Sequence, residues 1–183
     1  MPFDAEHWNA AVPFEAFLES VEEKADVWKS AWERAELSDR DRERLAALPG
    51  PRRVLVLTED WCGDAARSVP VLARAVEAAP GSELRVLDIE SNPGLIDRHL
   101  SRGARAIPVA VVQDEDGGDL GWWGPRPAAL QTLLRERLAE LGPPAPEAKG
   151  EFYAPVLRWY RTDAGRTVLD EFLLLLERGG KPA

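Results

Sequence analysis

Cys62 is the only cysteine in the 183-residue chain, and its position favours nucleophilic chemistry. It follows an apolar run at residues 53–58, which predicts a buried central strand, and it precedes an apolar-periodic helix through Val69 and Val76. Open α/β folds place their sites at this end of the sheet. Because the amides at a helix start stabilise an anion, we expect a lowered thiol pKa and a partly exposed side chain. The alternative is an inert, buried cysteine.

Two carboxylates, Asp60 and Asp64, flank this cysteine. If both were close and ionised, they would oppose formation of the thiolate and offset the effect of the helix start. The alternative is that they are solvated loop residues or helix caps. They are therefore candidate modulators of Cys62.

The remaining candidates for chemistry are few. His7 and His99 are far apart in the sequence, and together with one cysteine they give no metal-ligand spacing, so we expect no metal and no cofactor. Trp122 and Trp123 are adjacent in a strand-like run and should point to opposite faces. Either helices cover both faces, which we expect, or one tryptophan is exposed and binds a partner.

Several segments have the patterns of secondary structure that would position these residues. Spacings of three and four at residues 14–32 predict one amphipathic helix with a buried aromatic stripe. Ser38 and Asp41 resemble a capping arrangement for a second short helix, and Asn92 is a plausible cap for a helix at residues 93–100.

The other segments predict an alternation of strands and helices. A strand at residues 84–89 completes a parallel βαβ unit with the strand at 53–58. The runs at 109–113 and 119–123 predict a hairpin, so the sheet is mixed. Further helices are expected at 127–141 and, after a proline-rich linker, as a pair within 152–178.

Composition limits the functions that this chain can serve. Hydrophobic residues make up 45% and charged residues 30%, which is typical of one globular domain. The net charge of −9 argues against a nucleic-acid partner or an anionic membrane surface. No apolar run is long enough to span a membrane, and the N-terminus lacks a signal-peptide pattern, so we predict a cytoplasmic protein. One cysteine also allows no intramolecular disulfide.

The motif around Cys62 resembles the active-site loop of the thioredoxin superfamily. Residues 59–65 read Glu-Asp-Trp-Cys-Gly-Asp-Ala, which is similar to Trp-Cys-Gly-x-Cys with Ala65 in place of the second cysteine. Residues 103–108, Gly-Ala-Arg-Ala-Ile-Pro, resemble the cis-proline loop that precedes a strand. The resemblance covers about residues 50 to 141, and within the superfamily the chain looks most like bacterial proteins of unassigned role.

This resemblance implies a fold and a set of site residues. The fold would be a thioredoxin-like three-layer α/β/α sandwich with a helical extension at 1–49, a core at 50–141, and a linker with C-terminal helices packing on the core at 142–183. Cys62 would be the nucleophile, next to a cis peptide bond before Pro108. Substrate would bind through four residues, namely Trp61, Gly63, Ile107 and Pro108.

Two departures from the superfamily pattern leave alternatives open. Ala65 removes the thiol that resolves a mixed disulfide, and Val56 stands where thioredoxins usually hold a buried aspartate. The chain is either a monothiol relative of the thiol–disulfide oxidoreductases, acting on protein or small disulfides and thiols, or a non-catalytic binding module. Ala65 is either natural or an engineered replacement that traps mixed disulfides.

Overall fold

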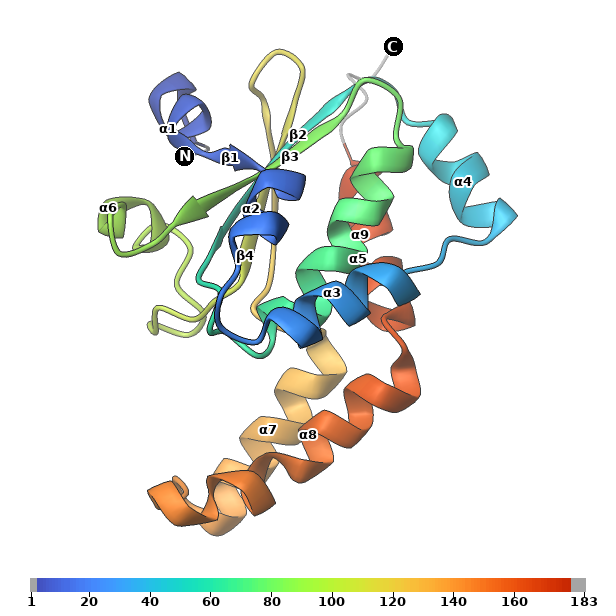
Figure 1. Ribbon diagram of the computed structural model, residues 1–183. Coiled ribbons are helices and arrows are strands. Elements are labelled where there is room, and N and C mark those ends of the chain that lie inside the picture. Colours follow the sequence, from blue (N-terminus) through green and yellow to red (C-terminus); the bar gives the residue numbers. More distant parts are fainter. Residues whose placement is uncertain (1–2, 179–183) are drawn as a thin grey trace.

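The computed structural model describes residues 3–178 and contains a mixed five-stranded sheet in the order β1-β3-β2-β4-β5 (Figure 1). The parallel pair is β2 with β3, and the other three pairs are antiparallel. The predicted mixed sheet with its C-terminal hairpin is therefore confirmed. The strands are β1 (Val12–Pro13), β2 (Arg52–Thr58), β3 (Glu83–Asp88), β4 (Val109–Asp114) and β5 (Asp119–Trp123).

The central strand β2 is buried on both faces, as its continuous apolar run predicts. Its residues Val54, Leu55, Val56 and Leu57 are all fully buried. Thr58 pairs with Asp88 in the parallel register, so β2 and β3 end at the same edge of the sheet. The loop that carries Cys62 starts at this edge.

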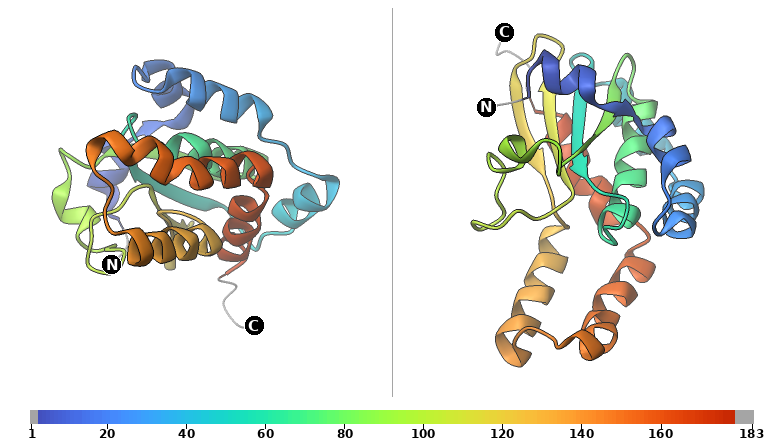
Figure 2. Two further views of the ribbon diagram at one scale, coloured as in Figure 1. Left: turned by 90° about the horizontal axis from the view of Figure 1, so that it is seen from below. Right: turned by 60° about the vertical axis from the view of Figure 1, so that its left-hand side comes forward.

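Helices cover both faces of the sheet and form the expected three layers. Helices α5 and α9 lie on one face, and the short helices α1 and α6 lie on the other (Figures 1 and 2). The helices in chain order are α1 (Ala5–Ala10), α2 (Phe14–Ser20), α3 (Ala25–Arg34), α4 (Asp39–Ala46), α5 (Ala65–Ala78), α6 (Pro93–Ile96), α7 (Ala128–Leu141), α8 (Lys149–Asp163) and α9 (Arg166–Leu176), with a 3-10 turn at Pro146–Ala148.

The single helix expected at residues 14–32 is wrong, because the structure divides it into α2 and α3. Lys24 adopts a left-handed conformation between the two helices. The backbone amides of Glu22 and Glu23 each donate to the Asp60 carboxylate at 3.0 Å, so a distant side chain satisfies the amides of this break. The aromatic stripe is nevertheless buried, with Trp28 fully enclosed.

Two predicted helix caps have different outcomes. Ser38 and Asp41 form a reciprocal capping box at the start of α4, as expected. Asn92 occupies the cap position of α6, but its side chain makes no capping hydrogen bond. The side-chain Nδ2 of Asn92 donates instead to the backbone oxygen of Asp88 at 2.9 Å, and this hydrogen bond competes with capping.

The C-terminal helices form two separate structures. Helices α7 and α8, joined by the proline-rich segment, pack against each other as a projecting pair that we call the helical arm, residues 128–163 (Figures 1 and 2). The arm has its own small hydrophobic cluster, whereas α9 returns to pack on α5 and β5. The domain boundaries after residues 49 and 141 stay predictions. Within residues 3–178, no helix is both long and apolar enough to cross a membrane.

Candidate functional site

Cys62 lies in the loop between β2 and α5 and faces the segment before β4. Its Sγ donates to the backbone oxygen of Ile107 at 3.5 Å. The Ile107–Pro108 peptide bond is cis, as expected from the sequence, and both residues are buried. Two segments separated by 45 residues in the sequence are thereby brought into contact.

The expectation that Cys62 is partly exposed with a lowered pKa is wrong. The residue is only 6% exposed. Burial raises the pKa of the Cys62 thiol and outweighs the backbone amides of Ala65 and Asp64 and the Arg126 guanidinium, which all act to lower it. The Asp64 carboxylate adds to the rise. The thiol is therefore the favoured form of this side chain at neutral pH.

The other residues of the motif flank Cys62 in the chain and differ in their exposure. Trp61 is 46% exposed, so a large apolar side chain stands at the surface beside a buried cysteine. The backbone oxygen of Gly63 accepts a hydrogen bond from Arg67 Nη1 at 2.6 Å. Ala65, at the position of a second cysteine, is the first residue of α5 and is fully buried.

Asp60 connects the motif loop to the N-terminal helices. One of its carboxylate oxygens accepts both amides of the α2–α3 break, and its backbone oxygen accepts from Trp28 Nε1 at 2.8 Å. Asp60 therefore acts as an anchor for this region, a role that neither alternative drawn from the sequence contained.

Asp64 connects the same loop to the C-terminal part of the chain. Tyr160 of α8 donates to its Oδ1 at 2.8 Å, and Arg126 Nη2 lies 2.6 Å from its Oδ2. Asp64 occupies the N-cap position of α5, but its side chain makes no capping bond and is only 15% exposed, so the alternative of a solvated loop residue or a helix cap is wrong. Tyr160 and Arg126 carry no local motif, and sequence reasoning missed both.

Glu59 lies just after β2 and binds the backbone that follows β3. Its Oε1 accepts the backbone amides of Ile89 at 2.9 Å and Glu90 at 3.3 Å. Burial raises the pKa of Glu59 to about 7, and its hydrogen bond with the Asp88 carboxyl acts in the same direction. This carboxyl therefore changes charge near neutral pH.

The backbone of Gly124 packs closely against the cis-proline segment. A Cβ at this position would lie 2.1 Å from the Pro108 backbone oxygen, and the residue has a φ of +132°, which disfavours any side chain. The Gly124–Pro125 bond is also cis. A glycine before a proline was the available signal, but no local pattern indicates that Gly124 contacts Pro108.

The tryptophan pair is divided between the two faces of β5. Trp123 is buried and its Nε1 donates to Glu171 at 2.9 Å. Trp122 is 37% exposed, so the expectation that both tryptophans are covered is wrong. His99 is buried against it, with ring centroids 5.9 Å apart, and burial lowers the pKa of His99. No cluster of three possible metal-ligating side chains occurs within residues 3–178.

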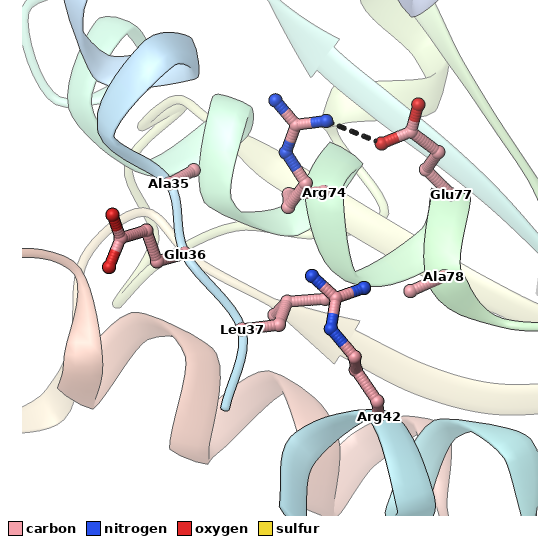
Figure 3. A pocket seen from close by; sticks show the side chains of 7 residues that line it. All are labelled: Ala35, Glu36, Leu37, Arg42, Arg74, Glu77 and Ala78. Carbon is pink, nitrogen blue, oxygen red and sulfur yellow. Dashed lines mark hydrogen bonds and ion pairs between the residues drawn. The ribbon is translucent and has the colours of Figure 1, made fainter. Parts of the chain in front are cut away.

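A pocket of about 490 Å³ lies between the α3–α4 connection and α5, away from the motif loop (Figure 3). Two arginines and two glutamates line it, together with three apolar residues. Arg74 pairs with Glu77 at 2.6 Å, donates to the Trp32 backbone oxygen and stacks on the Trp32 ring. None of the lining residues belongs to the Cys62 loop, so this pocket is not part of the candidate site.

Comparisons with known proteins agree with this geometry. The fold is similar to the crystal structure of a Pseudomonas aeruginosa protein of unknown function, with a TM-score of 0.74, 22% identity, and coverage of 97% of this chain and 98% of that chain. It is also similar to an HIV epitope scaffold, with a TM-score of 0.73, 19% identity and coverage of 96% and 98%. At these identities the similarity shows the fold alone.

Of the two comparisons of sequence, only the one with family profiles finds a match. No curated protein matches the chain. The sequence profile of the thioredoxin family matches residues 11–140, which include the Cys62 loop, the cis-proline segment and all five strands. The chain belongs to the thioredoxin family.

Proposed function

We propose that Cys62 performs monothiol thiol–disulfide exchange on a protein or small-molecule disulfide. The observation that carries the proposal is the contact of Cys62 Sγ with the backbone oxygen of Ile107 in the cis-proline segment, beside the exposed Trp61. Trp61, Gly63, Ile107 and Pro108 would bind the substrate. We place this exchange in the cytoplasm, and the reaction requires no cofactor.

The reaction follows from the presence of one thiol. Cys62 loses its proton to solvent, and the thiolate attacks one sulfur of the substrate disulfide. The S–S bond of the substrate breaks, its other sulfur leaves as a thiolate and takes up a proton, and a mixed disulfide with Cys62 remains. An external low-molecular-weight thiol then attacks the substrate sulfur of the mixed disulfide and releases Cys62.

A raised thiol pKa sets the pH dependence of this reaction. Because only the thiolate attacks, the rate of mixed-disulfide formation rises about tenfold per pH unit while the thiol remains mostly protonated. For Cys62, burial shifts this pKa upward. The rate should therefore still be rising above pH 8.

The burial of Cys62 favours a second candidate, a non-catalytic thioredoxin-fold binding module. A thiol that is 6% exposed and has a raised pKa has the properties of a structural cysteine. In this case Trp61 and the cis-proline segment would bind a partner without covalent chemistry.

Restoring the second cysteine separates the two candidates. Cys62 stands three residues before Ala65, the first residue of α5, and the Ala66 amide donates to the Cys62 backbone oxygen at 3.0 Å in a helical turn. Side chains three residues apart in such a turn are neighbours, so Ala65→Cys should form an internal disulfide. We expect this variant to reduce insulin disulfides in dithiothreitol, while the wild-type chain accumulates mixed disulfides visible by mass spectrometry. The double variant Cys62→Ser, Ala65→Cys controls for an added thiol. If Ala65→Cys forms its disulfide yet reduces nothing above background, the binding module is the better account.

A further inference from the structure

We propose that Tyr160 and Arg126 are positioning residues for Cys62, which fix the Asp64 carboxylate and balance its charge beside the thiol. The inference deepens the proposed function and rests on Cys62 being its nucleophile. Through Tyr160 in α8 and Arg126 just before α7, the helical arm and the segment that leads into it would influence the candidate site directly.

The geometry engages both carboxylate oxygens of Asp64. Oδ1 accepts from the Tyr160 hydroxyl at 2.8 Å, and Oδ2 pairs with Arg126 Nη2 at 2.6 Å. Asp64 stands two residues after Cys62 at the start of α5, where an unengaged carboxylate would be free to cap the helix. The two partners therefore turn the carboxylate away from the helix and toward the arm.

Burial makes these contacts stronger than surface pairs. Tyr160 is 7% exposed, and the side chains of Arg126 and Asp64 are 20% and 15% exposed. Charges in such surroundings are less screened by water and salt than exposed ones. Burial and the Asp64 charge both raise the pKa of Tyr160, so its hydroxyl is protonated and donates at neutral pH.

The charged neighbours of the motif explain why the Asp64 pair matters for the thiol. The Asp64 carboxylate disfavours a thiolate at Cys62, and the Arg126 guanidinium favours it. The pair therefore presents a nearly balanced charge, and removing one member leaves the other unopposed. Other charged groups near this loop are Arg67 on the Gly63 oxygen, Lys24 beside Gly63, and Glu59 and Asp60, which bind backbone amides.

The test is the pH profile of Cys62 alkylation by iodoacetamide, which needs no substrate and follows the only thiol in the chain. We expect Asp64→Asn to lower the pKa of Cys62 and Arg126→Gln to raise it. At a pH below the thiol pKa, each change should alter the rate about threefold to tenfold, in opposite directions. The double variant Asp64→Asn, Arg126→Gln should have an alkylation profile close to that of the wild type.

Tyr160→Phe tests the positioning role without changing charge or ring packing. It should shift the profile in the direction of Arg126→Gln, but by less. Tyr153→Phe, on the same helix and partly buried, and the exposed Arg158→Gln are matched controls that should leave the profile unchanged. Circular dichroism and denaturant unfolding establish that each variant is folded, and Tyr160→Phe serves if an Asp64 or Arg126 variant is not.

The outcomes distinguish this inference from the function on which it rests. Profiles that coincide for wild type, Asp64→Asn, Arg126→Gln and Tyr160→Phe would overturn the positioning role, even if Cys62 forms mixed disulfides. Profiles that shift as expected support the positioning role. Failure of the same proteins to form mixed disulfides would then count against the exchange reaction alone.

Discussion

The N-terminal helices and the helical arm are far apart in sequence, yet each reaches the Cys62 loop through one aspartate. Asp60 binds the backbone of the α2–α3 break, whereas Asp64 binds two side chains, Tyr160 and Arg126. The first contact holds a backbone in place, and the second, in our proposal, balances the charge of Asp64 beside the thiol. Two carboxylates that flank one cysteine thus have different roles because their partners differ.

The two regions also differ in how they join the core. The N-terminal aromatic residues belong to the main hydrophobic cluster, with Trp28 fully buried. The arm has a separate cluster formed by five buried residues, namely Leu130, Leu134, Phe152, Val156 and Tyr160. We therefore expect damage in the first region to lower global stability and damage in the second to remain local.

The largest effect is expected at Trp28. Trp28→Ala removes a fully buried ring and its Nε1 hydrogen bond to the Asp60 backbone oxygen, so the free energy of unfolding should fall by about 3 to 5 kcal/mol. Denaturant unfolding measures it. Trp61→Ala, at a 46% exposed tryptophan, is the matched control and should cost under about 1 kcal/mol. Equal losses would contradict the assignment of Trp28 to the core.

A smaller and local effect is expected in the arm. Phe152→Ala removes a buried ring from the small cluster and should cost about 2 to 3 kcal/mol of local stability. Hydrogen exchange should speed up in α7 and α8 while the amides of β2 keep their protection. Faster exchange in β2 to the same degree would show that the arm and the sheet unfold as one unit.

The next largest effect on the free energy of unfolding is expected at Asp60. Its variants also distinguish the role of Asp60 from that of Asp64. Asp60→Ala leaves the amides of Glu22 and Glu23 without their acceptor and should lower the free energy of unfolding by about 1 to 2 kcal/mol. Asp60→Asn keeps an acceptor oxygen and should cost less. Unlike Asp64→Asn, it should leave the alkylation profile of Cys62 in place. A shift as large as that of Asp64→Asn would remove the distinction between the two aspartates.

The sequence predicts the parts of this fold that depend on local patterns. The strand β2, the β4–β5 hairpin and the capping box at Ser38 each follow from short patterns. The cis bond before Pro108 was implied by the family resemblance and is also observed. The break at Lys24 could not be predicted, because it depends on Asp60, more than thirty residues away. The apolar residues at 14–32 keep spacings of three and four through the break, and this pattern is the same whether or not a distant acceptor such as Asp60 exists.

The contact of Cys62 with the cis-proline segment was expected from the family resemblance and is observed. The burial of Cys62 was not expected, because it depends on side chains that pack only in the folded chain. Tyr160 lies 96 residues from Asp64, and no local pattern relates them. The contacts that engage Asp64 therefore depend on tertiary structure.

The smallest effect expected is the pH dependence of stability at Glu59. Its folded pKa of about 7 lies above the unfolded value of 4.5, so the folded state holds the proton more tightly and loses stability as pH rises from 4.5 through 7. Partial exposure limits the loss to about 1 kcal/mol. Asp88 has a lowered pKa, so its contribution is lost only below pH 4, outside this window.

Glu59→Gln isolates this effect. Its unfolding midpoint should rise relative to wild type between pH 5 and pH 8, because the variant carries no carboxyl to ionise. Glu83→Gln is the control at an exposed carboxyl and should run parallel to wild type. Parallel curves for Glu59→Gln would contradict a Glu59 titration near neutral pH.

The most direct test of Cys62 as a nucleophile is intact-mass measurement after incubation of the chain at pH 8.5 with a small peptide dimer linked by one disulfide. We expect the wild-type chain to gain the mass of one peptide of the dimer, faster as pH rises. An added thiol should remove this adduct, and Cys62→Ser should not form it. Absence of the adduct on folded wild-type protein, with the adduct appearing only after denaturation, would show that Cys62 is a buried structural cysteine.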